Sequence, residues 1–378
     1  MLDYETLKLI WWVLLGVLFI GFAITDGFDM GSCTLLPFLG KNDVERRLII
    51  NAVGPTWEGN QTWLITAAGA TFAAWPLVYA VAFSTFYIPL LLTLFALFFR
   101  PVGFDYRSKL TDPLWRNAWD WGLFVGSVVP AFIFGVAFGN LFLGVPFELD
   151  SDMRVAGSGN LLGYLSPFAL LSGLISVLML CLHGAVFLQL KTEGEVAERA
   201  RQCAGWLAIG LIVTFAAAGF WLTTIKGHRI TVMADAGGAI APLQKTVAIE
   251  KGGWLANYGD YTWMILAPSA VFFGVVLALY FSARNRAMQA FLASSVAIAG
   301  IILTAGFSLF PFMVPSSINP ASGLTVWDAS SSQRTLAIML WVAIVFFPIV
   351  VAYTLWVYRV LRGRLSTAQI IEKTHTAY

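Results

Sequence analysis

Long apolar segments separated by short polar loops are the dominant pattern of this chain. Eight segments reach about 20 residues, enough to cross the hydrocarbon core of a membrane as helices. They lie near residues 8–28, 77–99, 119–142, 164–187, 204–224, 261–283, 287–311 and 336–358. Their apolar residues form continuous runs and do not alternate with polar ones. The pattern therefore predicts an all-α polytopic membrane protein.

A ninth segment, residues 48–74, is also mainly apolar but contains Glu58, Asn60 and Gln61. The charges of the loops indicate whether it spans the membrane. If it does, the basic loops all lie on one side: 41–47, 100–109, 191–201, 284–286 and the tail from 359. The acidic loop 148–152 then lies on the other side. The positive-inside rule places the N-terminus outside and the C-terminus in the cytoplasm, so we predict nine spans, which hydropathy divides into four, four and one.

Composition supports the membrane assignment and narrows the function. Of the 378 residues, 58% are apolar and 12% are charged, and there are 15 Trp and 30 Phe. A net charge of +2 is too small to indicate a nucleic-acid partner. Cys33, Cys181 and Cys203 are odd in number and widely spaced, so they predict neither disulfides nor a metal site. The first apolar run, 7–25, is longer than a signal-peptide core and is expected to stay in the mature protein.

Glu58 is the first candidate for chemistry. Counted along a continuous helix, it follows Arg47 by 11 residues, which would place it about 16 Å deep in a hydrocarbon layer of about 30 Å. An ionisable side chain at that depth usually faces a bundle interior and serves ion or proton movement. Asn51, Thr62 and Thr66 recur at helical spacing around it and predict a polar stripe able to hold water.

Asp26 and Asp29 form a second acidic feature, at the end of the first span. They are three residues apart and so share nearly one helix face. The helix dipole opposes two carboxylates at a C-terminal end, so a compensating cation is expected nearby, and Arg100 is the best candidate. With nine spans, Arg100 and Asp105 lie on the same side as the two aspartates. Either a structural ion pair or a role in proton entry is compatible with this pattern.

Histidines are scarce: the chain has His183, His228 and His375. A protein that held several haems through its own histidines would need more of them. His183, within a predicted span, is more readily explained by a hydrogen bond to a neighbouring helix than by haem ligation. No nucleotide-binding motif or metal-spaced set of ligands occurs in the sequence.

Ordered sequence blocks along nearly the whole chain resemble one protein family, subunit II of cytochrome bd-type quinol oxidases, which are bacterial respiratory terminal oxidases. The blocks are ITDGFDMG from Ile24, NDVERR from Asn42, WEGNQTW from Trp57, FRPVGFDYRSK from Phe99, WRNAWDWG from Trp115, GVAFGNLFLGVPF from Gly135, FPFMVPSS from Phe310 and LTVWDASSSQ from Leu324. Such long blocks in the same order make the resemblance specific.

The resemblance implies a complex in the bacterial inner membrane that oxidises quinol, reduces O2 to water and builds a proton gradient without pumping. Two haems b and one haem d would be carried mainly by a haem-bearing subunit I, with small single-span accessory subunits and a quinone that is also bound structurally in some members. The fold implied is two four-helix bundles plus a peripheral helix. The corresponding ranges are 1–143, 160–314 and 335–360, with a cytoplasmic tail at 361–378.

The resemblance also implies roles for individual residues. Glu58 matches the intramembrane carboxylate of the family, which is aspartate in some members, and we assign Glu58, Asp26 and Asp29 to a proton pathway from the cytoplasm. Arg100, Asp105 and Tyr378, with Asp29, match a polar cluster at the cytoplasmic end. A proton-coupled secondary transporter is the alternative function, but it would be expected to show paired acidic halves. A purely structural scaffold for the haem subunit is a third reading.

Overall fold

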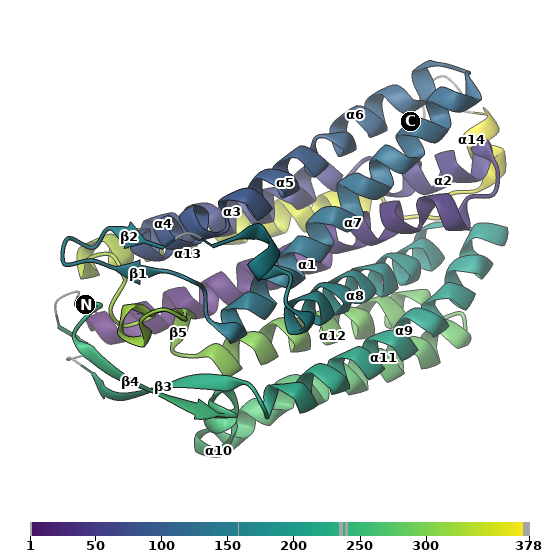
Figure 1. The fold of residues 1–378 in the computed structure, drawn as a ribbon. Helices are drawn as coiled ribbons and strands as arrows, with labels where there is room; N and C mark the ends of the chain where they lie inside the picture. The colour runs from purple at the N-terminus through teal and green to yellow at the C-terminus, as the bar shows by residue number, and fades with distance from the viewer. Residues whose placement is uncertain (1, 158, 234–236, 239–240, 373–378) are drawn as a thin grey trace.

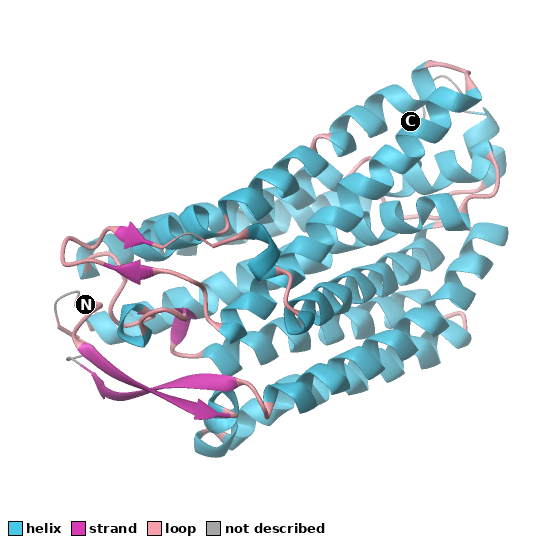
Figure 2. Ribbon diagram, viewed as in Figure 1, coloured by secondary structure: helices cyan, strands magenta, loops and turns pink. Residues whose placement is uncertain are grey.

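The computed structural model describes residues 2–157, 159–233, 237–238 and 241–372, and long helices running side by side make up most of it (Figures 1 and 2). The helices are α1 (Tyr4–Leu39), α2 (Asp43–Val53), α3 (Trp57–Ala74), α4 (Pro76–Thr85), α5 (Tyr87–Leu97), α6 (Phe99–Tyr106), α7 (Pro113–Leu143), α8 (Pro167–Lys191), α9 (Glu195–Leu222), α10 (Ala256–Asp260), α11 (Leu266–Ala283), α12 (Ala287–Leu309), α13 (Gln333–Val360) and α14 (Thr367–Glu372). Within the described residues, eight helical segments are long and apolar enough to cross a membrane. The prediction of an all-α polytopic membrane protein is confirmed.

Contacts far apart in sequence show where the chain reverses. At one end the Tyr4 hydroxyl donates to Ser331 O at 2.7 Å and the Trp75 indole N–H donates to Val326 O at 3.2 Å. At the other end Arg46 pairs with Asp120 at 2.8 Å. The chain therefore runs from one end to the other along α1 and returns through α2 and α3. Together α2 and α3 are the ninth pass, although the hydropathy of α3 is too low for it to be recognised as a span.

Prolines break two of the predicted continuous spans, and this corrects the sequence analysis. The predicted helix 48–74 ends at Val53 and restarts at Trp57, because Pro55 has no N–H to continue the helix. The predicted helix 77–99 is interrupted at Phe86, between α4 and α5. Pro89 has no N–H, so it cannot donate a helical hydrogen bond to the Thr85 carbonyl. The Tyr164 hydroxyl donates to that carbonyl at 2.7 Å instead, which shows how a neighbouring segment satisfies the released group.

Short strands at the end that holds the N-terminus are a second difference from the all-helical expectation. They form three two-stranded antiparallel sheets: β1 (Glu148–Leu149) with β2 (Val155–Ala156), β3 (Lys226–Met233) with β4 (Lys245–Lys251), and β5 (Phe312–Val314) with β6 (Leu324–Thr325). The β3–β4 hairpin lies in the long connection between α9 and α10. It is fixed there by a buried ion pair, Lys245 to Asp328, at 2.8 Å. Burial lowers the pKa of Lys245, and Asp328 opposes this change.

Helix α1 is the centre of the fold because it packs against α3, α7, α8 and α12. Glycines allow the closest of these contacts, between α1 and α8. A Cβ atom on Gly31 would lie 1.9 Å from the carbonyl oxygen of Leu180, and one on Gly184 would lie 2.4 Å from the amide nitrogen of Ser32. Small residues let helix backbones approach in this way when hydrophobic burial does not drive association in lipid.

Gly31→Ala should therefore lower the yield of folded protein, because the new methyl group collides with backbone that cannot move aside. Overpacking of this kind costs about 1–3 kcal/mol. The measurement is the fraction of the membrane-extracted protein that remains monodisperse on heating. Gly16→Ala, on the same helix with nothing within 4 Å of the added Cβ, is the control and should behave as the wild type. Equal stability of the two variants would contradict the close α1–α8 contact.

The contacts between the β3–β4 hairpin and residues 312–318 should loosen in acid. His228 of β3 packs against Trp254 and Phe312, and its Nε2 donates to Ser316 O at 3.0 Å. Burial lowers the pKa of His228, and the bond to Ser316 opposes this change. The folded state thus binds the proton less well than the unfolded chain, whose histidine pKa is about 6.5. The stability contribution is complete above that pH and is lost as the pH falls below it.

Hydrogen exchange of residues 226–233 and 312–318, followed from pH 7.5 to about 5, measures this effect. Because the intrinsic exchange rate of an amide itself slows as the pH falls in this range, the quantity compared is the protection factor. The protection factors of both segments should decrease as the pH falls, and His228→Gln, which has no proton to gain in this range, should remove that decrease. If the wild type and the variant respond to pH alike, His228 is not the group responsible.

Candidate functional site

A buried ion pair between α1 and α6 is the strongest polar feature of the membrane-spanning region. The Arg100 guanidinium donates to both carboxylate oxygens of Asp26, at 2.9 and 2.5 Å, and neither side chain is exposed. Two parallel bonds of this kind match the fork of arginine to a carboxylate. The ring of Trp57 lies 5.7 Å from the guanidinium carbon and stacks on Phe104. Arg100 is therefore the cation that the sequence predicted for the aspartates.

Asp29 lies one turn further along α1 and is also fully buried. Its Oδ2 accepts a hydrogen bond from Asn60 Nδ2 of α3 at 2.7 Å. Asn60 Oδ1 in turn accepts from the Tyr358 hydroxyl of α13 at 2.5 Å. Neither Asn60 nor Tyr358 was predicted to belong to the site. Asn60 stands two residues after Glu58 in the sequence, which is a usable signal, but nothing in the sequence links Tyr358 to Asp29.

Glu58 lies apart from these buried acids. It occupies the first turn of α3 and is exposed. It begins an exposed stripe along that helix, which we call the α3 stripe: Glu58, Gly59, Thr62, Ile65, Thr66, Gly69 and Phe72. The predicted polar stripe is therefore present for Glu58, Thr62 and Thr66. Asn51 is not part of it, because the break at Pro55 places it on a different helix.

The depth of Glu58 stays a prediction. The estimate of half the membrane thickness assumed a continuous helix from Arg47, and the chain is interrupted between α2 and α3. Two residues after Glu58, Asn60 contacts Tyr358, which lies two residues before the end of α13, and Asp29, which lies ten residues before the end of α1.

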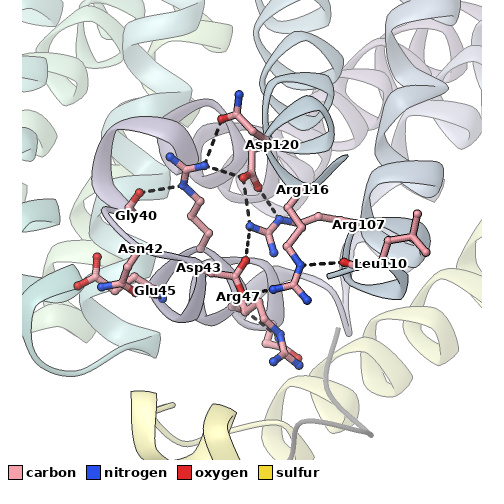
Figure 3. A network of polar contacts seen from close by, with 12 residues as sticks. Gly40, Asn42, Asp43, Glu45, Arg47, Arg107, Leu110, Arg116 and Asp120 are labelled. Atoms are coloured by element: carbon pink, nitrogen blue, oxygen red, sulfur yellow. Dashed lines mark hydrogen bonds and ion pairs between the residues drawn. The ribbon is translucent and has the colours of Figure 1, made fainter. Parts of the chain in front are cut away.

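One member of the predicted cytoplasmic cluster, Asp105, is not brought to Arg100. Asp105 is exposed on α6, whereas Arg100 points into the bundle. Tyr378 lies outside the described residues. The structure instead has a different charged network at this end, formed by α2, the end of α6 and the start of α7 (Figure 3).

In that network the two carboxylates are each shared by two arginines. Asp120 accepts from Arg107 at 2.6 Å and from Arg46 at 2.8 Å. Asp43 pairs with Arg107 at 3.0 Å and with Arg116 at 2.6 Å (Figure 3). Arg107 and Asp120 are almost completely buried. The network joins α2, the end of α6 and the start of α7 at the arginine-rich end of the bundle.

His183 does not fit an axial haem ligand. It is fully buried, its Nδ1 is 2.7 Å from Ser294 Oγ and its Nε2 is 3.0 Å from Ile24 O. Its ring stacks on Phe291. Both ring nitrogens therefore already have partners within the chain, as the sequence analysis expected. Among the described residues, no group of three His, Cys, Asp or Glu side chains is placed to hold a metal ion.

An apolar cavity of about 260 Å³ lies where α1 and α7 meet α8, α9 and α12. Phe22, Phe138, Met179 and Phe215 are among the side chains on its wall. Four hydroxyl-bearing residues supply most of its polar character: Ser172, Ser176, Thr304 and Ser308. The cavity suits an apolar chain or ring rather than a charged ligand.

These features define a polytopic helical membrane protein with a buried acid–arginine site near the arginine-rich end. The model of the family described as cytochrome bd terminal oxidase subunit II matches residues 7–361. The chain belongs to this family. It is therefore a subunit of a membrane-bound quinol:oxygen oxidoreductase, a complex that contains haem and a subunit I.

Relatives agree over the full length. The chain is 50% identical to cytochrome bd-I ubiquinol oxidase subunit 2 of Escherichia coli strain K12, with 100% of both chains covered. It is 35% identical to cytochrome bd ubiquinol oxidase subunit 2 of Bacillus subtilis strain 168, over 94% of this chain and 96% of the relative. A solved structure of the bd oxidase from Geobacillus thermodenitrificans has the same fold, with a TM-score of 0.69 at 16% identity over 94% of this chain and 99% of that one. The family assignment favours the oxidase over the transporter alternative.

Arg100→Leu should reduce assembly of the complex more than its turnover. Removing one partner of a buried pair leaves Asp26 as an uncompensated charge, at a cost of about 3–5 kcal/mol. The measurements are the haem content of the purified complex and the oxygen uptake per haem. The matched control is the double variant Asp26→Leu with Arg100→Leu, which removes both charges and should recover part of the yield. Normal yield of Arg100→Leu with slow turnover would assign Arg100 to catalysis instead.

Proposed function

We propose that this chain supports the haem-bearing subunit and carries part of a cytoplasmic proton pathway to the site of oxygen reduction. The observation that supports this most directly is the buried acid site of Asp26, Asp29 and Arg100, close to Glu58 and to the arginine-rich end. Buried ionisable groups within membrane-spanning helices are costly and are generally kept for ion or proton movement. Oxygen reduction consumes protons, and these must cross a water-poor region to reach it.

Glu58 would hand protons to the partner subunit. The α3 stripe is polar in part, and a helix face that met only lipid would not present Glu58, Thr62 and Thr66. The neighbouring α13 contacts α3 through Trp63 and Phe347 and leaves large apolar side chains exposed, among them Trp341 and Phe346. We propose that subunit I covers this joint face of α3 and α13, so that Glu58 lies at the interface between the subunits.

The redox groups are assigned to the partner. We propose that two haems b and one haem d are held mainly by subunit I, since His183 has no nitrogen available for ligation. When bound, these groups supply the electron transfer from quinol to O2. A quinone held structurally in this subunit would fit the apolar cavity of about 260 Å³ between α1, α7 and α8. Small single-span accessory subunits complete the proposed complex.

Position in the membrane follows from the loop charges. We propose that the arginine network of Figure 3 faces the cytoplasm of a bacterial cell, with the N-terminus outside. We also propose the grouping into residues 1–143, residues 160–314 and the helix 335–360, with α1 and α7 of the first range packed on α8 of the second. In the first range α1 packs on α3 and α7, in the second α8 packs on α9 and α11 on α12, and α13 is largely exposed.

Glu58→Leu tests the pathway. The complex should keep its haems, because Glu58 is exposed and its loss leaves no buried partner, but oxygen uptake with quinol should fall by about 10²-fold or more, as expected when a proton-transfer group is lost. Glu58→Asp retains the carboxylate and is the control; it should stay much closer to the wild type. An undiminished rate in Glu58→Leu would leave the chain as a structural scaffold for the haem subunit.

A further inference from the structure

A hydrogen-bonded chain from the peripheral helix α13 ends on the carboxyl group of Asp29. It runs from the Tyr358 hydroxyl to Asn60 and from Asn60 to Asp29. We infer that Asn60 and Tyr358 are positioning residues that hold the Asp29 carboxyl in the orientation needed for proton transfer. The inference rests on the proposed function, in which Asp29 belongs to the proton pathway.

Asp29 depends on these hydrogen bonds because Arg100, the nearby cation, is already paired with Asp26. Both terminal nitrogens of Arg100 bond to Asp26. Within the described part of the molecule Asp29 has no ion-pair partner, and its Oδ1 is buried without a hydrogen bond. The contact from Asn60 to Oδ2 at 2.7 Å is thus the bond that orients the carboxyl. Of the two carboxyl groups, that of Asp29 has no ion pair, and it is therefore the one that can take up and release a proton.

Tyr358 determines which end of the Asn60 amide faces Asp29. An amide has an acceptor oxygen and a donor nitrogen on opposite sides, and a half-turn exchanges them. The Tyr358 hydroxyl donates to Oδ1, which directs Nδ2 toward the carboxyl and toward Thr25 O at 3.4 Å. Without the hydroxyl, the amide can turn and present its oxygen to the carboxyl of Asp29, which repels it when ionised.

The hydrogen bonds through Asn60 and Tyr358 also connect Asp29 to α13, which is part of the face proposed to contact subunit I. Helix α13 is attached near its outer end by Trp11, whose indole donates to Leu336 O, and near the other end by Tyr358, whose ring packs edge-on against Phe28. Most of the helix between them is exposed. A partner that docks on α13 would therefore set the position of Tyr358 and, through Asn60, the carboxyl of Asp29.

The same bonds have a simpler explanation, namely that Tyr358 only attaches α13 to the bundle. The two explanations differ in what happens to Asp29. If the bonds are only an attachment, removing the hydroxyl weakens the helix contact but leaves the carboxyl unchanged in the assembled complex. If they position Asp29, the carboxyl changes its hydrogen bonding even when assembly is complete.

Tyr358→Phe removes one oxygen atom and keeps the ring contact. In the purified complex with full haem content, we expect oxygen uptake per haem to fall about fivefold, the change that one lost hydrogen bond brings. Infrared difference spectroscopy should show a shifted carboxyl C=O band, identified as the band that Asp29→Asn abolishes. Tyr280→Phe, at an exposed position of α11 outside the joint face of α3 and α13, is the matched control and should change neither reading.

The outcomes separate the inference from the proposed function. A wild-type rate in Asp29→Asn would reject Asp29 as part of the pathway. A slow Asp29→Asn together with a Tyr358→Phe complex that has the wild-type rate and an unshifted band would overturn the positioning role. If Tyr358→Phe lowers the haem content, Asn60→Ser, which removes the amide and leaves the residues of α13 unchanged, must give the slower rate and the shifted band for the inference to stand.

Discussion

The pairing of charges that the membrane region buries is the constraint on which this structure depends. Arg100 and Asp26 are both inaccessible, and at such positions an isolated charge would cost several kcal/mol. Their bidentate contact fixes α6 against α1 at one angle and one depth. The break before α6, where Pro101 removes a helical hydrogen bond, gives that segment the freedom to turn Arg100 inward. The proline break before α6 thus helps to bury Arg100 against Asp26.

The two ends of the bundle are held in different ways. At the arginine-rich end, charged groups on α2, α6 and α7 share two carboxylates, so the helices are joined by bonds that tolerate contact with water. At the opposite end, indole and hydroxyl groups bond to backbone carbonyls, as with Trp75 to Val326 and Trp254 to Phe142. The apolar middle, where lipid supplies no hydrophobic driving force, is held by close glycine contacts such as that of Gly274 of α11 with the backbone of Ala293 of α12. Polar bonding at the ends and close packing between them together fix the helix positions.

Much of the fold could be predicted from the sequence because membrane helices must satisfy their backbone internally, and this makes them readable as apolar runs. The ninth pass could be predicted from the charges of the loops, although α3 is not apolar enough to be recognised as a span by hydropathy. A kink at Pro89 is expected of a proline inside a membrane helix, but the break at Pro55 could not be predicted, since neighbours that the sequence does not identify can bridge a proline. For the site, the pairing of Arg100 followed from the helix dipole and the predicted topology. The contact of Tyr358 with Asn60 did not, because it joins residues 298 positions apart and depends on how α13 lies against α3.

The exposure of Glu58 changes what this subunit can do by itself. Asp26, Asp29 and Arg100 form a closed set inside the chain, with their geometry fixed by α1, α3 and α6. Glu58 is outside that set, on the α3 stripe, and an ionisable group there has no protein environment until another chain covers it. A proton pathway made only of this subunit would therefore end at its surface. In the proposed pathway, delivery of protons to an oxygen-reducing centre requires the partner, which would make the interface itself part of the functional site.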